Sequence, residues 1–499
     1  MSRDPSALGF ASARAHALAE AGHVQVREKN WEKAIAFFQE SLALEPGKGL
    51  TWGALAYALE MSGRPEDAVA AYGSALALLP DTPAIAFNLG NVLRKLERLD
   101  EAEGAYRRAL GSNPRHAPSW NNLGLVLHMR GRPDDAIACY GRALGIDPGY
   151  AEALNNQGSA LVSKNEIVPA LEAYARALAV DPGLDRARFN QGVAHLLRGD
   201  FAQGWRGYEF RVRPPWIGAL CGVPWDGKEP LAGKTVVIPF EQGLGDTIHF
   251  ARYAERVANL GARVVLQVQP ALKRLLASVP GVSQVVSAGE PLPAHDTYCP
   301  MMSLPYVLGS TPEGVPAHVP YVRAPGELLD AWRSKLGGGA PRVGIAWSGN
   351  PGHHLDKWRS LPLALLLKAT EGIPLELFRI QRDIGPRDAA VLRSTPAIRD
   401  CTDDFADFAD SAALVSQLDL VISVDTSVAH LAGALGKPLW VLLPYAPDWR
   451  WMLARTDSPW YPTARLFRQS QHGDWASVLT PLRQALVERF GGSMVPGAS

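Results

Sequence analysis

The sequence predicts an α-helical solenoid followed by an α/β region with two parallel sheets. Two observations carry this prediction. In the first 200 residues, prolines and alanines recur every 34 residues, which is typical of stacked helix pairs. From residue 234 onward, short apolar runs alternate with helical segments, which indicates strands joined by crossover helices. A chain of 499 residues is too long for one core, and we expect about three domains.

Composition limits the classes of function. The chain has 50 basic and 50 acidic residues, so it lacks the basic excess of a general nucleic-acid binder, and we expect no nucleic-acid partner. Its four cysteines form no CxxC pair, which suits a reducing cytosol and argues against a zinc site. The first 20 residues contain no apolar signal-peptide core, and no run approaches the roughly 18 apolar residues of a membrane span. We therefore expect a cytoplasmic protein without membrane insertion.

The solenoid is predicted from residue 15 to 212, after an N-terminal extension of residues 1–14. Five full repeats share a small residue, an aromatic residue four positions later and a closing proline. These residues are Ala34, Ala68, Ala102, Ala136 and Ala170, Phe38, Tyr72, Tyr106, Tyr140 and Tyr174, and Pro46, Pro80, Pro114, Pro148 and Pro182. This is the tetratricopeptide pattern of two antiparallel helices per repeat. A sixth repeat is partial, with Gly204 and Tyr208 at the first two positions.

A column of asparagines lies inside the repeats. Asn88, Asn122, Asn156 and Asn190 hold the same place in successive first helices. Asparagine is a poor helix former, so this recurrence needs a reason. The amides either bind the backbone of an extended peptide or bond to neighbouring helices. The pattern resembles the asparagine ladder of the O-GlcNAc transferase superhelix, which implies that this column binds an acceptor polypeptide.

The α/β region is predicted to follow an ordered connector at residues 213–233, which is rich in proline, glycine and tryptophan. It divides into two Rossmann-like halves, 234–335 and 336–488, with a tail at 489–499. Strands are predicted at 235–239, 263–268, 283–287, 342–347, 375–380, 419–424 and 439–443, and a strand-loop at 298–303. Two such halves across a cleft make the GT-B architecture of nucleotide-sugar glycosyltransferases, which we expect here by analogy of fold.

The first half contains a glycine loop between a strand and a helix. Gly243 and Gly245 let the backbone approach a ligand, and the following helix N-terminus favours negative charge, so both are predicted to bind the donor. Asp246 is the candidate general base that takes the proton of an acceptor hydroxyl. His249, one turn later, can share or replace that role. The alternative is that Asp246 only caps its helix.

The second half offers donor-binding candidates at the ends of three strands. The first group, Asp425, Thr426, Ser427 and His430, follows a strand and opens a helix whose first N–H groups suit a phosphate. The alternative is that Asp425 or Thr426 is only an N-cap and that His430 is a packed side chain.

A second group follows the strand at 342–347. Ser348, Asn350 and Arg359 form one wall, and Gln381 ends the neighbouring strand. Arg359 is the preferred cation for a departing nucleotide because its guanidinium binds phosphate in a bidentate manner. Lys357 and His353 lie in the same loop, and the alternative is a solvated basic loop. The sequence contains no DxD triplet, so we expect no metal and no cofactor apart from the donor.

Four segments carry a family resemblance: EQGLGDTIHFARY, GIAWSGNP, DTSVAHLAGALGKP and SPWYPTARLFRQ. With the repeats, they make residues 15–485 resemble bacterial tetratricopeptide proteins that have a heptosyltransferase-like glycosyltransferase domain. Some of these proteins modify flagellin or other proteins on Ser or Thr, and the flagellin-modifying members are thought to use CMP-activated nonulosonic acids.

In that family a Gly-Asp pair, matched here by Gly245-Asp246, supplies the base. A DTG-x-x-H segment contacts the donor, and Ser427 stands at the place of its glycine. The resemblance implies a protein O-glycosyltransferase with a nucleotide-sugar donor and an extended acceptor, such as flagellin, in the solenoid. Two alternatives remain open: a non-catalytic adaptor with a decayed transferase half, and a transferase that acts on a glycan or lipid.

Overall fold

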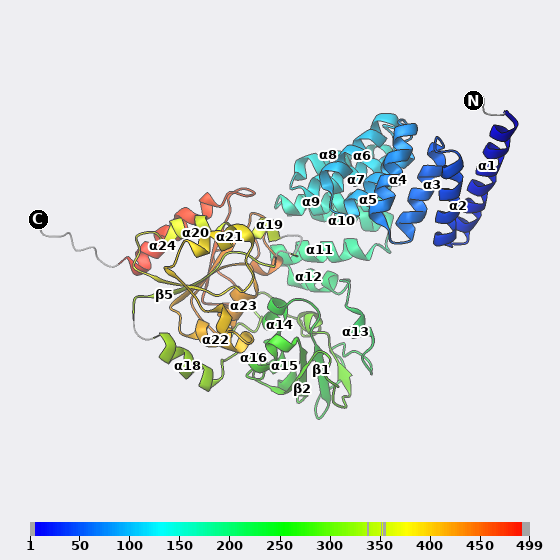
Figure 1. Cartoon of the computed structure of the whole chain (residues 1–499). Helices are drawn as coiled ribbons and strands as arrows, with labels where there is room; N and C mark the ends of the chain where they lie inside the picture. The colour runs from blue at the N-terminus through cyan, green and yellow to red at the C-terminus, as the bar shows by residue number, and fades with distance from the viewer. Residues whose placement is uncertain (1–4, 337–338, 351, 353–355, 492–499) are drawn as a thin grey trace, which may run out of the picture. The chain divides into compact units, whose positions relative to one another are not determined.

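The computed structural model describes residues 5–336, 339–350, 352 and 356–491. Two compact units divide the chain, Met1–Ala187 and Arg188–Ser499, and each is considered by itself (Figure 1). The predicted calls on His353 and on most of the tail lie outside the described residues, as does the side chain of Lys357.

The first unit consists of antiparallel helix pairs, as the tetratricopeptide pattern predicts. The helices are α1 (Pro5–Arg27), α2 (Trp31–Leu44), α3 (Gly49–Met61), α4 (Pro65–Leu78), α5 (Pro83–Lys95), α6 (Leu99–Ser112), α7 (Ala117–Met129), α8 (Pro133–Ile146), α9 (Ala151–Ser163) and α10 (Ile167–Val180). Each repeat proline follows the second helix of its pair, where a residue without an N–H cannot extend the helix. The predicted repeat therefore matches the observed pairs.

The repeat spacing follows from one recurring contact between an aromatic ring and a glycine. The rings of Phe38, Tyr106, Tyr140 and Tyr174 are buried. They lie so close to a glycine of the preceding helix that an added Cβ would come within 2.5 to 2.7 Å of a ring carbon. The glycines are Gly22, Gly90, Gly124 and Gly158. A side chain added at these four glycines would collide with the ring unless the helices shift, whereas the second repeat has Ala56 at the same position, buried together with Tyr72.

The second unit begins with α11 (Asp185–Arg198) and contains two parallel sheets. The first sheet has the order β3-β2-β1-β4. Its elements are α12 (Phe201–Tyr208), α13 (Pro215–Gly218), β1 (Thr235–Pro239), α14 (Leu244–Ala251), α15 (Ala254–Asn259), β2 (Arg263–Val268), α16 (Lys273–Leu276), β3 (Val282–Ser287), β4 (Thr297–Tyr298) and α17 (Leu304–Val307). In register, Val237 of β1 lies beside Val265 of β2 and Tyr298 of β4.

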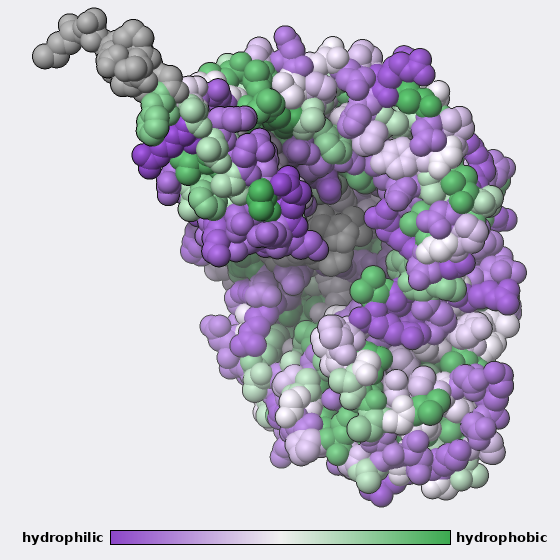
Figure 2. All heavy atoms as spheres, turned by 90° about the vertical axis from the view of Figure 1, so that its right-hand side faces the viewer, coloured by the Kyte–Doolittle hydropathy of each residue, from purple (hydrophilic) through white to green (hydrophobic). Residues whose placement is uncertain are grey.

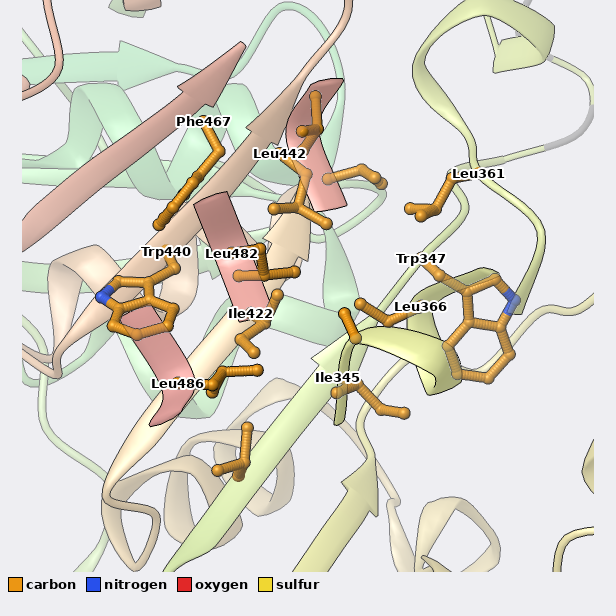
Figure 3. Packing of buried hydrophobic residues seen from close by; sticks show 14 of the residues in the cluster. Ile345, Trp347, Leu361, Leu366, Ile422, Trp440, Leu442, Phe467, Leu482 and Leu486 are labelled. Atoms are coloured by element: carbon orange, nitrogen blue, oxygen red, sulfur yellow. The ribbon is translucent and has the colours of Figure 1, made fainter. Parts of the chain in front are cut away.

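The second sheet has the order β10-β9-β8-β5-β6-β7. Its elements are α18 (Gly326–Leu336), β5 (Arg342–Ala346), α19 (Asp356–Arg359), α20 (Leu363–Thr370), β6 (Glu376–Arg379), α21 (Pro386–Arg393), β7 (Ile398–Asp400), α22 (Phe408–Ser416), β8 (Leu420–Val424), α23 (Ser427–Ala434), β9 (Leu439–Leu443), β10 (Ala464–Arg468) and α24 (Ala476–Phe490). Ile345 of β5, Ile422 of β8 and Leu442 of β9 share one core with Leu366 of α20 and Leu482 of α24 (Figure 3).

The α/β prediction is confirmed in its class and in most strands. All recorded strand pairs are parallel, and the predicted apolar runs coincide with β1, β2, β3, β5, β6, β8 and β9. The strands β7 and β10 were not predicted. They are the two edge strands of the second sheet, and both contain charged residues, so they lack the continuous apolar run of a buried parallel strand. The expected strand-loop at 298–303 is a strand only at Thr297–Tyr298.

Helix α12 packs against α14 and the segment after β9, and Ile217 of the connector packs on the first sheet of the second unit. The Trp205 ring of α12 lies 5.1 Å from the ring of Trp449 and 6.4 Å from that of Phe250 in α14. After the helix, the guanidinium of Arg211 donates two hydrogen bonds of 2.9 Å to the carboxylate of Glu241. Both side chains are 1% exposed. This buried bidentate pair fixes the loop that leaves β1.

The outer surface is mixed. On the face drawn in Figure 2, hydrophilic residues predominate, and apolar residues occur singly or in small groups. Among the described residues, the search for a helix with the length and apolar character of a membrane span finds none.

We expect Gly124→Ala to lower the free energy of unfolding of the solenoid by about 1–2 kcal/mol. The new methyl group would lie 2.6 Å from the Tyr140 ring, and overpacking of a core costs about 1–3 kcal/mol, which exceeds the gain of up to about 1 kcal/mol in helix propensity. Gly141→Ala is the matched control, because a Cβ at this exposed helical position meets nothing within 4 Å. Urea denaturation should show that Gly141→Ala stabilises; a stabilising Gly124→Ala would contradict the ring–glycine contact.

Candidate functional site

The site lies where loops from the carboxyl ends of both sheets meet, which is where parallel α/β sheets bind ligands. Gly245, in the first turn of α14 after β1, contacts the first turn of α23 after β8. An added Cβ at Gly245 would lie 2.9 Å from Cδ2 of His430 and 3.3 Å from Cα of Ser427. The structure thus brings together three residues that were predicted from two separate motifs.

Asp246 is engaged through both of its carboxylate oxygens. Oδ2 accepts a hydrogen bond from the N–H of Gly243 at 3.0 Å, which is the capping interaction considered as the alternative from sequence. Oδ1 accepts a hydrogen bond from Nη2 of Arg450 at 2.5 Å. The side chain is 23% exposed, so it is within reach of a ligand. The cap of the alternative reading is therefore present, and the second oxygen contacts a cation of the other half.

Arg450 is the functional candidate that sequence reasoning missed. It lies in the segment after β9, and its side chain is 7% exposed. Nη1 donates to Oδ1 of Asp448 at 2.8 Å, and the guanidinium lies 4.3 Å over the ring of Trp449. The signal was its place just beyond the carboxyl end of a strand, between an aspartate and tryptophans.

His249 and His430 share one partner, the hydroxyl of Tyr461. The distances from that oxygen to Nδ1 of His249 and of His430 are 3.1 and 2.8 Å. A single hydroxyl can donate to only one of the rings, so the other ring must carry its proton on Nδ1 and donate to the hydroxyl. Burial, together with the charges of Arg252 and Arg450, holds the pKa of each histidine well below its ordinary value. Both rings are therefore neutral at pH 7.

The burial of the two histidines narrows the roles predicted for them. His249 is 0% and His430 5% exposed. A ring with no exposed surface has no direct path to an acceptor hydroxyl, so His249 presents no accessible proton acceptor in this conformation. His430 matches the packed reading of the sequence, although its Nε2 lies 3.8 Å from Oδ1 of Asp425. Tyr461, which joins the pair, was not singled out from sequence.

Asp425 lies at the carboxyl end of β8 in a mostly buried position. Burial raises the pKa of its carboxyl to about 6, the charge of Asp448 adds to this rise, and Trp451, Arg359 and Arg450 oppose it. Nη1 of Arg359 donates to the backbone carbonyl of Asp425 at 3.0 Å. The predicted cation and the predicted strand end thus lie together.

The N-terminus of α23 begins at Ser427 and is not capped by a side chain. Thr426 occupies the N-cap position without a capping hydrogen bond, and its hydroxyl lies 3.1 Å from that of Ser423. Uncapped N–H groups at a helix start, with the positive end of the helix dipole, suit an anion. Thr426 therefore holds the N-cap position of the alternative reading without the capping hydrogen bond which that reading expects.

Gln381 braces the loop that follows β5. Its Oε1 accepts from the N–H groups of Trp347 and Ser348 at 2.6 and 3.0 Å. Its Nε2 donates to Oγ of Ser348 at 2.7 Å and to the carbonyl of Asp383 at 3.0 Å. Because both ends of the amide are engaged within the protein, Gln381 holds Ser348 in place. Asn350 accepts from the N–H of Gly352 at 2.9 Å, as in a local turn.

The asparagine column makes hydrogen bonds between helices. In the first unit, Nδ2 of Asn122 donates to Oδ1 of Asn91 at 2.8 Å, and Nδ2 of Asn156 donates to Oδ1 of Asn121 at 2.9 Å. This is the second of the two readings considered from sequence. It does not exhaust the amides, since each NH₂ group has a second N–H and each oxygen a second lone pair. Asn88 and Asn122 are half-buried, and Asn190 belongs to the second unit.

Within the described ranges, no cluster of three or more histidine, cysteine, aspartate or glutamate side chains has the arrangement of a metal site.

Comparison with known proteins places both regions. The tetratricopeptide repeat model matches residues 54–117, 87–151 and 155–204, and the model of glycosyltransferase family 9 (heptosyltransferase) matches residues 406–469. The second match contains Asp425, Ser427, His430, Arg450 and Tyr461. Protein FlbA of Caulobacter vibrioides is 27% identical over 319 residues, which are 58% of this chain and 53% of that protein. The match therefore spans about half the length of this curated relative.

Solved structures resemble the chain over about a third of its length. A MamA protein structure is 23% identical, with a TM-score of 0.33, and covers 34% of this chain and 92% of its own. YrrB, described as a tetratricopeptide protein with an unusual peptide-binding site, is also 23% identical, with a TM-score of 0.32. The match covers 34% of this chain and 88% of the YrrB chain.

Lowering the pH from 7.5 to 5.5 should lower the free energy of unfolding of the second unit. Because the pKa of His249 and of His430 is lowered in the folded chain, only the unfolded chain takes up these protons below about pH 6.5. Each site then costs about 1.4 kcal/mol per pH unit. Asp425 opposes this loss of stability. Its pKa is about 6 in the folded chain and about 4 in the unfolded chain, so between these pH values the folded chain binds the proton more tightly and gains stability as the pH falls.

Urea unfolding at several pH values, followed by tryptophan fluorescence, measures this slope. The variant His430→Gln should show a shallower loss of stability toward low pH than the wild-type chain. His295→Gln is the control, since His295 lies in a part-exposed loop before β4. Equal slopes for His430→Gln and the wild type would mean that His430 already titrates in the folded chain.

Proposed function

Because the chain combines tetratricopeptide repeats with a glycosyltransferase family 9 segment, we propose that it is a protein O-glycosyltransferase of GT-B type. It moves a sugar from a nucleotide sugar, such as a CMP-nonulosonic acid, to Ser or Thr of an extended protein acceptor such as flagellin. The observation that carries the proposal is the meeting of the Gly243–Asp246 loop with the first turn of α23, which lies inside the family 9 segment.

The donor phosphate is assigned to the first turn of α23. The uncapped N–H groups at Ser427 attract an anion, and Arg359 is held beside them by the carbonyl of Asp425. Gly245 adds a backbone without a side chain at the opposite wall. Arginine cations take the place of a metal in this assignment, because the sequence has no DxD triplet.

The acceptor hydroxyl is assigned to Asp246. Its exposure of 23% and its ion pair with Arg450 keep a carboxylate at the junction of the two sheets, where a proton acceptor is needed. His249, one turn after Asp246 in α14, is hydrogen-bonded to Tyr461, and both are assigned the role of positioning this helix.

We expect Asp246→Asn to reduce turnover by about 10²–10⁴, the usual contribution of a general base. The amide oxygen can still accept from Gly243, so the helix cap is retained. Asp296→Asn is the control, because Asp296 similarly accepts from a backbone N–H, that of Thr235 at 2.7 Å, but at the opposite, amino end of β1. Turnover by Asp246→Asn within threefold of the wild type would remove Asp246 from the chemistry.

Intact-mass analysis of candidate acceptors co-expressed with the chain tests the function itself. A mass increase equal to one or more glycosyl units on flagellin or another protein supports protein glycosylation. Calorimetry with CMP, UDP, GDP and ADP separates the alternatives. An adaptor with a decayed transferase half binds none of these nucleotides, and a transferase for glycans or lipids binds one of them but modifies no protein.

The asparagine column is proposed to bind the acceptor backbone. A triple variant of the column, Asn88→Ala with Asn122→Ala and Asn156→Ala, should weaken acceptor binding severely, since the contacts act on one chain and each is worth about 0.5–1.5 kcal/mol. The matched control replaces the amides of the same network that lie outside the column, Asn91, Asn121 and Asn155.

Both triple variants lose interhelical hydrogen bonds, so both should unfold at a somewhat lower temperature. If the column binds peptide, only the column variant also loses acceptor affinity. Equal losses of affinity in the two variants, in step with their thermal midpoints, would leave the column with a structural role only.

A further inference from the structure

Arg450 is a buried cation that links the two sheet-bearing halves of the second unit. Its Nη2 contacts Asp246, from the first half, at 2.5 Å, and its Nη1 contacts Asp448, from the second, at 2.8 Å. A buried charge persists only when partners surround it. Burial by itself lowers the pKa of the Arg450 guanidinium, but Asp448 and Asp246 raise it well above its ordinary value. Arg450 therefore stays charged.

The third nitrogen of this guanidinium is not used by the protein. Nε of Arg450 is buried and has no hydrogen-bond partner within the described part of the chain. Leaving a buried donor unpaired costs roughly 1–3 kcal/mol, and more on a charged group. Trp449 covers one face of the guanidinium at 4.3 Å. Nε is closed to a ligand in this conformation, and a movement of the Arg450 side chain would bring this donor to a ligand oxygen.

Three carboxylates and three arginines surround this position. Asp246, Asp448 and Asp425 face Arg450 and Arg359. Arg252 acts on the same two histidines as Arg450, and Tyr208, His249, His430 and Tyr461 are the other titratable groups recorded near the guanidinium. A phosphate that enters next to these carboxylates is held more strongly by the arginines when one of the carboxylates becomes neutral. Protonation of Asp246 by the acceptor hydroxyl would achieve this.

We propose that Arg450 is a catalytic residue that moves from Asp246 to the nucleotide phosphate, and that it thereby couples departure of the nucleotide to proton uptake by Asp246. This inference rests on the proposed function. Asp448 is its positioning partner, because it also accepts from the backbone N–H of Arg450 at 2.9 Å.

The charges balance through the step. The acceptor oxygen bonds to the anomeric carbon while the bond from that carbon to the phosphate oxygen breaks, and its electron pair remains on the phosphate. The hydroxyl proton goes to Asp246. The carboxylate loses its negative charge as the phosphate gains one, so Arg450 exchanges one anionic partner for another and is never left unpaired.

Nucleotide binding alone tests this exchange, because the product nucleotide carries the same phosphate charge. Calorimetry in buffers of different ionisation enthalpy measures protons taken up on binding, near pH 6, of whichever of CMP, UDP, GDP and ADP the wild-type chain binds. We expect Arg450→Gln to weaken binding by about 10–100-fold, the range for hydrogen bonds to charged groups. We also expect Asp246→Asn and Arg450→Gln to take up fewer protons than the wild type.

Arg455→Gln is the matched control. Arg455 belongs to the same segment and is also paired with an aspartate, Asp457, at 2.7 Å, but it is 34% exposed. Its nucleotide affinity and proton uptake should equal those of the wild type. If Arg450→Gln does not fold, Arg450→Lys decides, since it keeps the charge but loses the forked geometry; it should bind nucleotide at least fivefold more weakly.

The outcomes separate failure of the proposed function from failure of the role proposed for Arg450. A wild-type chain that binds none of the nucleotides overturns the proposed function and this inference with it. A wild-type chain that binds, with unchanged affinity in the Arg450 variants or unchanged proton uptake in Asp246→Asn, overturns this inference alone.

Discussion

The second unit depends on the need of one buried guanidinium for carboxylate partners. Arg450 reaches the second sheet through Asp448 and the first through Asp246. A charge at 7% exposure cannot be left without these partners, because removing one side of a buried pair costs several kcal/mol. The loops after β1 and β9 are thereby held together. Close approach of Gly245 to Ser427 and His430 then follows, because no side chain at Gly245 separates them.

The first unit was predicted almost completely from sequence, because its structure is local. Each repeat contacts mainly its neighbours, so the 34-residue spacing carries both the helix boundaries and the contacts between helices. The contact of the Tyr140 ring with Gly124 is an example, because the two residues are only 16 positions apart in the sequence. Parallel strands could also be predicted where they are buried on both faces. The edge strands β7 and β10 combine apolar and charged residues, so they lack the continuous apolar run of such a strand.

The site was predicted in part. The residues that were found and the residues that were missed differ in how far along the chain their partners lie. Residues in the loop or first helical turn after a strand, such as Gly245 and Ser427, could be located because the strand–loop–helix pattern is local. Arg450 and Tyr461 could not, because their partners Asp246 and His249 lie 204 and 212 positions away. Gln381 follows its strand as predicted, but its amide is hydrogen-bonded to Ser348. The sequence contains no signal for such a partner.

The aromatic surroundings of the site extend into helix α12. Trp205 and Tyr208 of α12 lie against Trp449, whose ring covers Arg450. Phe201 of the same helix stacks on Trp460, and Trp460 contacts His249. A helix that continues the repeat pattern thus supplies part of the aromatic shell that keeps water from the guanidinium and the two neutral histidines. Low local polarity strengthens the Asp246–Arg450 interaction, so the last helix of the repeat region belongs physically to the site as well as to the solenoid sequence pattern.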